Sequence, residues 1–335
     1  MIKAITRLPR VHLGYYPTPL AEAKHLSSIL GGPKILIKRD DLSGLALGGN
    51  KCRKLEFLLG YTLQQGYDSF IISGISNLSV QLAAACARKN IPVTQILLGS
   101  STQKQGNTVL TKVLTPEIKI VAASPVTNMK EAIMRRNEVL DRELIRQHKE
   151  GHNPFVMRSY DSTPMENTGL VNAFDEIHRQ LTERNIRANY LIIATSQGGS
   201  HAGLEVGNRY LGSPFKVLGI STLWQSERAK IDVARMATET AEYLNLDFNM
   251  NQNEIMITDE YLGSGYGRIT KESTEAMKIV ARTEGIFLDP IYTGKAMAGL
   301  IGMIRQGYFN PQDVVVFFHT GGIPIIFEHC DEFDG

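Results

Sequence analysis

The sequence lacks the features that mark several common classes of protein. Its three cysteines, Cys52, Cys86 and Cys330, are scattered and form no CxxC pair, which argues against a disulfide framework or a zinc site. No apolar run approaches the roughly 18–20 residues that a membrane span requires. The formal net charge of +2 gives no electrostatic reason to expect nucleic acid or an anionic membrane as a partner. We therefore expect no metal site, no nucleic-acid partner and no membrane association.

Targeting and nucleotide-binding motifs are also missing. Residues 1–20 include basic side chains but no apolar segment of the kind that a secretory signal contains, so we expect a cytoplasmic protein. Neither GxGxxG nor GxxxxGK[ST] follows an expected strand, which argues against a dinucleotide-binding or P-loop enzyme. What is present is a chain of 335 residues, 43% hydrophobic and 21% charged, which is typical of a folded protein of one large domain or two smaller ones.

The hydrophobic pattern predicts an α/β fold. Short apolar runs typical of buried strands occupy residues 34–38, 70–73, 93–98, 118–122, 154–157, 190–195, 215–221 and 313–318. Helical spacing of apolar residues covers 54–66, 79–90, 129–148, 169–184 and 271–285, and we expect a surface loop at 99–108. This alternation predicts a mainly parallel sheet with helices on both faces, and ligands bind such sheets beyond the carboxyl ends of the strands.

The segment GGNKCRKLEF, residues 48–57, places Lys51 directly after a glycine turn and at the start of an expected helix. A helix N-terminus already carries partial positive charge, so a cation there is mildly unfavourable. Taken alone, the pattern allows two interpretations: a solvated basic first turn, or a lysine that the glycine turn holds for chemistry. The remaining motifs have to decide between them.

Several other turns have the residues that bind anions or polar groups. The strand at 190–195 runs into SQGGSH before a helix, and glycines there let backbone N–H groups converge on a phosphate at the helix N-terminus. Ser76 and Asn77 stand at the expected N-cap of a helix, where a substrate carboxylate can bind, although such caps are also ordinary structural features. Two further turns carry hydroxyl or carboxyl groups at the residues Asp289, Tyr292, Thr293 and Thr320.

Together these motifs suggest pyridoxal phosphate, which requires a lysine, a phosphate cup and a side chain near its pyridine nitrogen. The chain resembles the fold type II pyridoxal-phosphate enzymes, and within them the branch of D-cysteine desulfhydrase and 1-aminocyclopropane-1-carboxylate (ACC) deaminase. The motifs that carry the resemblance span nearly the whole chain in order: PTPL (17–20), IKRDDL (37–42), GGNKCRKLEF (48–57), GGSHAGL (198–204), GYG (265–267), LDPIYTGKAMAGL (288–300) and HTGG (319–322).

The resemblance implies a tryptophan synthase β-like architecture, a two-domain open parallel-sheet α/β fold with pyridoxal 5'-phosphate as cofactor. Residues 1–53 and 161–335 are expected to form a large cofactor-binding domain, and residues 54–160 a small domain that closes over the substrate. A homodimer and a small amino-acid substrate are implied in the same way.

The resemblance also implies a role for each matching residue. Lys51 is expected to form the Schiff base and to remove the Cα proton, and its position should ease deprotonation of its amine. Gly198 to His201 are expected to hold the phosphate, Asn77 the ring hydroxyl and Thr320 the pyridine nitrogen. The full cofactor-binding set is Lys51, Asn50, Lys54, Asn77, Gly198, Gly199, Ser200, His201 and Thr320. The catalytic set is Lys51, Ser76, Tyr266 and Tyr292, with Ser76 at the substrate carboxylate and the tyrosines on the substrate side.

Two positions favour the desulfhydrase over the deaminase. ACC deaminases of this family resemble Tyr-Glu-Gly where this chain has a threonine at residue 293, and they carry leucine in place of Thr320. Desulfhydrases resemble this chain, with threonine at both positions. A neutral hydroxyl at the pyridine nitrogen also makes the ring a weaker electron sink, which suits β-elimination better than transamination.

Two departures from the family pattern affect the substrate side. Leu78 replaces a polar residue after Ser76-Asn77, and Tyr160-Asp161 replace a glycine pair, so we expect a reshaped pocket. The leading hypothesis is a pyridoxal-phosphate lyase that eliminates the β-substituent of a small amino acid, by default D-cysteine, and gives pyruvate and ammonia. The alternatives are a β-replacement synthase, which an apolar Leu78 would suit, an ACC deaminase, and a non-catalytic member of the family.

Overall fold

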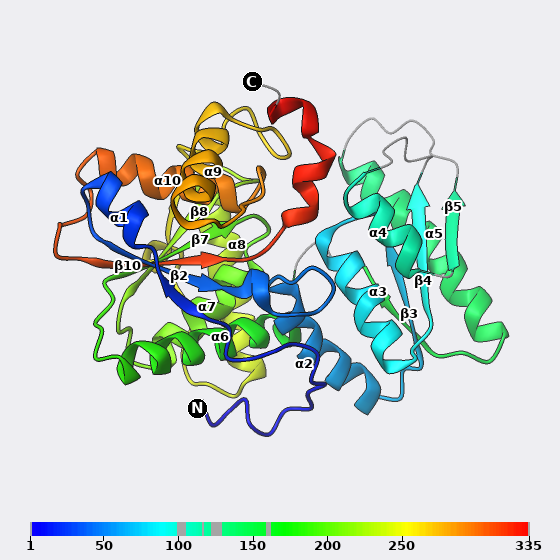
Figure 1. Cartoon of the computed structure of the whole chain (residues 1–335). Helices are drawn as coiled ribbons and strands as arrows, with labels where there is room; N and C mark the ends of the chain where they lie inside the picture. Colours follow the sequence, from blue (N-terminus) through cyan, green and yellow to red (C-terminus); the bar gives the residue numbers. More distant parts are fainter. Residues whose placement is uncertain (1, 99–104, 116, 122–128, 159–161, 334–335) are drawn as a thin grey trace.

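The computed structural model describes residues 2–98, 105–115, 117–121, 129–158 and 162–333, which fold around two β-sheets (Figure 1). The larger sheet has the order β1-β2-β10-β7-β8-β9. Its strands are β1 (Leu20–Glu22), β2 (Lys34–Arg39), β10 (Val314–His319), β7 (Tyr190–Thr195), β8 (Lys216–Ser221) and β9 (Met256–Thr258). All neighbours pair in parallel except β1 with β2, so the carboxyl ends of the parallel strands share one edge.

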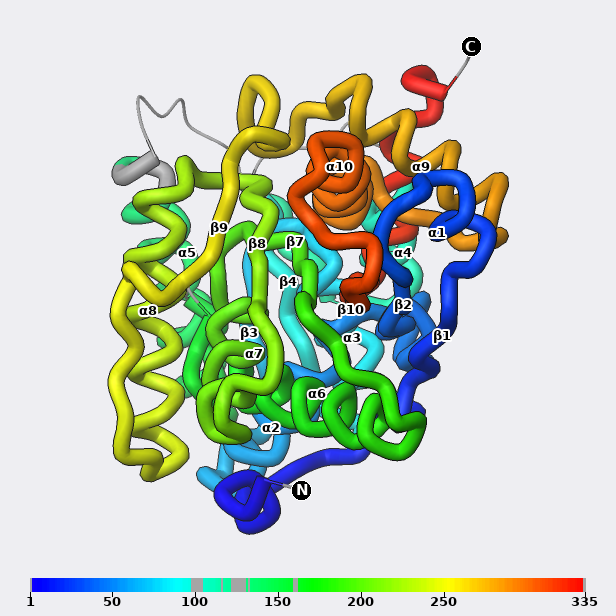
Figure 2. Tube along the Cα trace, turned by 90° about the vertical axis from the view of Figure 1, so that its left-hand side faces the viewer, coloured from blue at the N-terminus to red at the C-terminus, as the bar shows by residue number. Residues whose placement is uncertain are grey.

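Helices cover both faces of the larger sheet, as Figure 2 shows. One face packs against α1 (Lys24–Leu30), α9 (Lys271–Glu284) and α10 (Thr293–Arg305), whose apolar residues form one core with the strands. The other face packs against α6 (Pro164–Glu183) and α7 (Gly199–Tyr210), with α8 (Ser226–Tyr243) outside α7. Strands buried on both faces explain the continuous apolar runs in the sequence.

The smaller sheet is entirely parallel and has the order β5-β4-β3-β6. Its strands are β3 (Ser69–Ser73), β4 (Val93–Leu98), β5 (Glu117–Val121) and β6 (Pro154–Met157). Successive residues of β3 face opposite cores: Phe70 and Ile72 pack with α3 (Asn77–Lys89), while Ile71 packs with α5 (Met129–Lys149). A further helix, α4 (Asn107–Leu114), packs against α3.

Helix α2 (Lys51–Gln64) runs between the two sheets and packs against both α6 and α3. Its approach to α6 requires a glycine, because a Cβ on Gly169 would lie 2.2 Å from the Arg53 carbonyl oxygen. The helix that begins at Lys51 is therefore packed closely against α6, which covers one face of the larger sheet. The division into domains at residues 53/54 and 160/161 stays a prediction.

The structure confirms the predicted fold class and the predicted elements. Each of the eight expected strands agrees with an observed strand to within one residue at the described positions, and the five expected helices are all present. The short strands β1 and β9 and the helices α1, α4 and α8 were not predicted. Part of the expected loop at 99–108 lies outside the described residues, and its last two residues begin α4. Short 3-10 helices occupy Asp40–Leu42, Gln252–Glu254, Ile323–Glu328 and Cys330–Phe333.

None of the described helices has both the length and the apolar composition that crossing a membrane would require.

Candidate active site

The predicted glycine turns meet at the carboxyl edge of the larger sheet. The turn before α2 and the turn after β10 touch backbone to backbone: the Asn50 N–H donates to the Thr320 carbonyl oxygen at 3.0 Å. A Cβ on Gly321 would lie 2.6 Å from the Gly49 Cα, and both glycines have positive φ. Only glycine allows this approach, so the turns bring the start of α2 to the end of β10.

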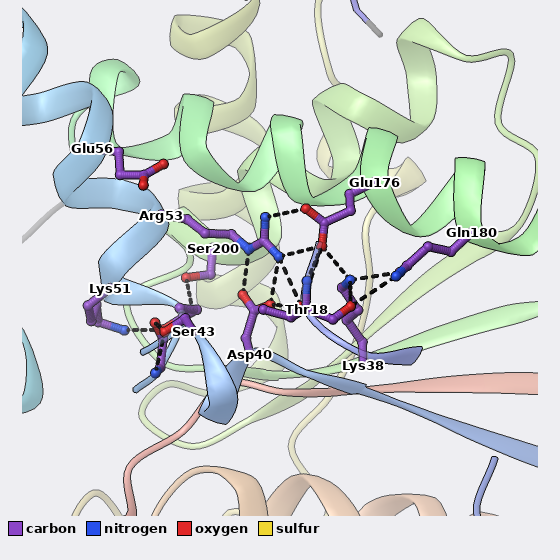
Figure 3. A network of polar contacts seen from close by, with 12 residues as sticks. Thr18, Lys38, Asp40, Ser43, Lys51, Arg53, Glu56, Glu176, Gln180 and Ser200 are labelled. Atoms are coloured by element: carbon purple, nitrogen blue, oxygen red, sulfur yellow. Dashed lines mark hydrogen bonds and ion pairs between the residues drawn. The ribbon is translucent and has the colours of Figure 1, made fainter. Parts of the chain in front are cut away.

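Lys51 is connected to the second glycine turn by a chain of hydrogen bonds (Figure 3). Its Nζ donates to Asn50 Oδ1 at 3.0 Å, and Asn50 Nδ2 donates to Ser200 Oγ at 2.9 Å. The Asn50 side chain is buried, whereas Lys51 and Ser200 are partly buried. The structure thus brings together three residues that sequence analysis assigned to one site from segments 150 positions apart.

Burial lowers the pKa of the Lys51 amine to about 7, from an ordinary value of 10.5. The positive charge of Lys54 acts in the same direction, while Glu166 and Asp289 oppose it. A primary amine with this pKa is substantially neutral near pH 7 and can accept a proton there. Lys51 is thus unlike a solvated first-turn lysine, which would keep its ordinary pKa.

The lowered pKa of Lys51 should be visible in the stability of the apoprotein. Between pH 7 and 10.5 the folded chain binds fewer protons than the unfolded chain, so the free energy of unfolding rises with pH. For Lys51 we expect a gain of about 2 kcal/mol from pH 7 to pH 9. Urea unfolding of the wild-type and Lys51→Met apoproteins at both pH values measures it. Other lysines also contribute, so the difference between the two proteins is the relevant quantity, and an equal rise in both would contradict the lowered pKa.

The second glycine turn has the features of an anion site. Gly198 adopts the left-handed conformation and caps α7, which directs the free N–H groups of the first turn of that helix outward. Gly199 lies against Ser162, because a Cβ there would be 2.1 Å from the Ser162 Cβ. Lys54 Nζ donates to Ser162 Oγ at 2.7 Å. A buried lysine and two serine hydroxyls therefore converge on one helix N-terminus, which fits a phosphate group.

His201 belongs to this turn in sequence, but its imidazole points away from it. Nδ1 lies 3.0 Å from Thr195 Oγ1, and Nε2 lies 3.4 Å from Glu205 Oε1. The side chain is completely buried between α7 and the sheet. Any contact of His201 with a phosphate would thus come from its backbone N–H.

Tyr266 and Tyr292 lie together, as the sequence analysis expected for the substrate side. Their hydroxyl oxygens are 2.7 Å apart, and Tyr266 is half exposed. Burial and the neighbouring Tyr266 raise the pKa of Tyr292 well above its ordinary value, so its phenol stays protonated. The buried Asp289 carboxylate fixes this turn by accepting hydrogen bonds from the backbone N–H groups of residues 291–293.

The hydroxyl of Thr293 is hydrogen-bonded to the same Asp289 carboxylate. Its Oγ1 lies 2.6 Å from Asp289 Oδ2 and accepts from the Asp289 N–H at 2.8 Å, and the residue is fully buried. Thr320 contributes its carbonyl oxygen to the turn of Asn50, and its hydroxyl has no hydrogen-bond partner among the described residues. Thr293 therefore supports the turn, whereas Thr320 keeps a free hydroxyl for a ligand.

Ser76 and Asn77 stand at the start of α3, as predicted. Their side chains bond to residues outside the Lys51 turn, by which we mean Gly48 to Lys51 at the start of α2. Ser76 Oγ accepts from the Ser79 N–H at 3.1 Å as the N-cap, and the residue is exposed. Asn77 Oδ1 accepts from Asn107 Nδ2 at 2.9 Å, and the Asn107 N–H donates to Glu328 at 2.8 Å. Sequence analysis missed Asn107 and Glu328, because no local pattern signals a contact between α4 and the C-terminal segment.

Gln81 connects α3 to the Lys51 turn directly. Its Nε2 donates to the Gly48 carbonyl oxygen at 2.8 Å, and its side chain is buried. Sequence analysis did not identify Gln81, since a glutamine inside a helix of small residues gives no signal. It did single out Leu78, which is partly buried and packs against the core of α2 and α3. Tyr160 and Asp161 lie outside the described residues.

A buried ionic network fixes α2 on the side opposite Lys51 (Figure 3). Arg53 donates to both carboxylate oxygens of Asp40 at 2.7 and 2.8 Å and to both of Glu176 at 3.1 and 2.8 Å. Lys38 and Thr18 also bind Glu176. Burial alone would raise the pKa of Glu176, but Arg53 and Lys38 outweigh it and lower that pKa to about 2. The network thus joins β2, α2 and α6 through ionised groups.

The described residues contain no group of three or more His, Cys, Asp or Glu side chains that could hold a metal ion. Burial raises the pKa of the thiols of the two buried cysteines, Cys52 and Cys86, to about 12. Such thiols remain protonated and unreactive at neutral pH.

Comparison with known proteins shows which family the chain resembles over most of its length. The family described as "Pyridoxal-phosphate dependent enzyme" matches residues 11–321. A Pyrococcus abyssi protein named "Putative 1-aminocyclopropane-1-carboxylate deaminase" is 34% identical over 330 residues, which cover 98% of this chain and 96% of that protein.

Solved structures agree. A crystal structure of an ACC deaminase homologue superposes with a TM-score of 0.85 at 30% identity and covers 98% of this chain and 96% of its own. The processed form of threonine deaminase isoform 2 from Solanum lycopersicum has a TM-score of 0.66 at 16% identity, with 95% of this chain and 82% of its own covered. The latter likeness concerns the fold alone.

Proposed function

The chain belongs to the family of pyridoxal-phosphate-dependent enzymes, and from that premise we propose that it is a lyase that eliminates the β-substituent of a small amino acid, with D-cysteine as the expected substrate. The family assignment confirms the prediction of pyridoxal phosphate as cofactor. The substrate, the leaving group and the residue roles below are parts of the proposal.

The residues present fit this cofactor. The N-terminus of α7, Ser200 and Lys54 suit the phosphate, and the Lys51 amine is connected to the same turn through Asn50. The free hydroxyl of Thr320 suits the pyridine nitrogen. When bound, pyridoxal phosphate supplies an electron sink that stabilises negative charge at the substrate Cα. The protein's part is to orient the substrate and to move protons.

One arrangement supports the proposal most strongly: hydrogen bonds through Asn50 connect the Lys51 amine to Ser200 at the anion site, and burial lowers the pKa of that amine to about 7. A base with this pKa can take a proton from Cα at neutral pH and return to its starting state afterwards. Its action requires a substrate that has a Cα–H. The hydrogen-bonded pair of Tyr266 and Tyr292 offers a protonated hydroxyl that can pass a proton to the departing β-substituent.

The arrangement around Tyr292 favours elimination over opening of a cyclopropane ring. ACC has no Cα–H, so Lys51 cannot begin that reaction by removing an α-proton. The position where ACC deaminases carry glutamate is Thr293, and its hydroxyl is bound to Asp289. The carboxylate of Asp289 is itself buried and accepts four hydrogen bonds from its own turn. ACC deamination is the second candidate, because two relatives of 30% identity or more are named a putative ACC deaminase and an ACC deaminase homologue.

The substrate carboxylate is proposed to bind at the N-terminus of α3, next to the exposed Ser76. The hydrogen bond from Gln81 to the Gly48 carbonyl oxygen and the contact of Asn77 with Asn107 hold this helix to the rest of the site. A homodimer, a cytoplasmic location and closure of residues 54–160 over the substrate complete the proposal. The homodimer and the closure rest on the resemblance to the family, and the location on the few, scattered cysteines.

Pyruvate assays on D-cysteine, a β-chloro amino acid and ACC test the proposed reaction. We expect pyruvate from the first two, with slow turnover of D-cysteine, and none of the corresponding oxoacid from ACC. D-cysteine should be slow because Leu78 removes a polar partner, and the loss of one such group typically costs ~10²–10³ in rate. Leu78→His should therefore raise D-cysteine turnover.

The matched control is Leu63→His, a leucine exposed on α2, which should leave turnover unchanged. Robust deamination of ACC would contradict the argument from Thr293 and Thr320. Turnover of none of the three compounds by a protein that binds the cofactor would favour the β-replacement synthase or the non-catalytic alternative.

A further inference from the structure

A second polar site lies at the amino-terminal edge of the larger sheet, away from the glycine turns. A hollow of about 400 Å³ opens there between the carboxyl end of α7 and the amino end of β8. Helix α7 has 12 residues, so at 1.5 Å per residue its carboxyl end is about 18 Å from its phosphate end, and the lining residue Glu205, six residues from Gly199, is about 9 Å from that end. The hollow is therefore separate from the candidate active site.

The inner wall of the hollow offers hydrogen-bond acceptors. Asn208 is 6% exposed, and its Oδ1 is buried without a hydrogen-bond partner in the described part of the chain. Glu205 lies three residues earlier on the same face of α7 and is also 6% exposed. Its Oε1 lies 3.4 Å from Nε2 of the His201 imidazole, a nitrogen that has no hydrogen-bond partner among the described residues. Acceptors buried in this way are stabilised by a ligand that brings N–H donors.

The rim of the hollow offers positive charge. Arg187 and Lys216 are exposed there, and neither has an ion pair with a described residue. Lys216 lies over the ring of Tyr190, whereas the neighbouring Arg209 is already paired with Glu254 at 3.4 Å. Arg187 and Lys216 can therefore bind an anionic group of a ligand. The hydrogen-bond donors of the same ligand would reach the inner wall.

Part of the remaining lining is apolar, whereas Asn189, Ser213 and Glu254 add polar groups. Met250, Met256 and Val217 line the side of the hollow towards β9. Methionine side chains are flexible and adapt to apolar groups of different shape. The ligand that matches all three parts has an amino group, a carboxylate and an apolar side chain.

We propose that this hollow binds a free α-amino acid with an apolar side chain of about the size of leucine. Its ammonium group donates to Asn208 Oδ1 and to the Glu205 carboxylate. Its carboxylate meets Arg187 and Lys216, and its side chain lies against Met250 and Met256.

Calorimetric titration of the holoenzyme with L-leucine and D-leucine tests the site, with the cofactor absorbance recorded in parallel. We expect one leucine of at least one enantiomer to bind per chain without a change in the cofactor absorbance. 4-Methylpentanoate lacks the ammonium group and 3-methylbutylamine lacks the carboxylate. The dissociation constant of each should therefore be at least about 10-fold higher than that of leucine.

Two variants locate the binding. Arg187→Ala and Asn208→Leu should each raise the dissociation constant of leucine about 10-fold. Arg187 is exposed, so that variant is expected to fold even if Asn208→Leu does not. Arg142→Ala, which removes an exposed arginine from α5, and Ser76→Ala in the candidate active site should leave leucine binding unchanged.

Three results would overturn the proposal. They are the absence of binding by either enantiomer, an affinity that Arg187→Ala and Asn208→Leu both leave unchanged, and binding that always alters the cofactor absorbance. None of these readouts requires turnover, so failure here is distinct from failure of the proposed lyase activity.

Discussion

Lys51→Ala should lower kcat by about 10³-fold or more, because it removes the general base. It also removes the group that is proposed to link the cofactor to the protein. The side chain is partly buried, and within the described part of the chain its amine makes one hydrogen bond, to Asn50, so the fold should survive the change. Steady-state assays with D-cysteine or the β-chloro amino acid measure the loss, with circular dichroism as the test of folding.

The matched control is Lys34→Ala, which removes a half-exposed lysine at the start of β2. It pairs with the equally exposed Glu22, and such surface pairs contribute little to stability. Turnover by Lys34→Ala should equal that of the wild type. If Lys51→Ala kept more than about a tenth of the wild-type kcat, Lys51 would not be the base.

Arg53→Met should cause the largest loss of stability of any single change considered, about 3–5 kcal/mol in the free energy of unfolding. Arg53 is 1% exposed and is bound to two buried carboxylates, Asp40 and Glu176. Methionine fills similar space but leaves Asp40 without a cationic partner in the network and Glu176 with Lys38 alone. Urea unfolding of the apoprotein at neutral pH measures the effect.

Arg305→Met is the control for this prediction, since Arg305 pairs with Glu275 at the surface and both side chains are about half exposed. Its effect should stay within about 1 kcal/mol. A double variant, Arg53→Met with Asp40→Asn, should be more stable than the sum of the single effects implies, because the second change removes the stranded charge. Simple additivity would show that the network is not coupled.

The fold was accessible from the sequence because its signals are local. Strands buried on both faces, such as β7 and β10, appear as continuous apolar runs, and the long amphipathic helices show their own period. The three-residue strands β1 and β9 are too short for such a signal. Helix α8 was overlooked although it has 18 residues.

The site was accessible only in part, for the same reason. Lys51 and the glycine turns stand in short motifs, so their position could be predicted. Ser162 and Glu176 could not, because their contacts with Lys54 and Arg53 join residues 108 and 123 positions apart. The orientation of the His201 imidazole also depends on tertiary packing, since Thr195 and the sheet decide it.

The central claim is that Lys51 carries the cofactor, and borohydride reduction of the holoenzyme followed by peptide mapping tests it most directly. Reduction makes the link between lysine and cofactor permanent, so the labelled peptide identifies the residue. We expect one label, on the peptide that contains Lys51. A label on Lys38, Lys54 or Lys295 instead, or no labelled lysine in a protein that retains the cofactor, would contradict it.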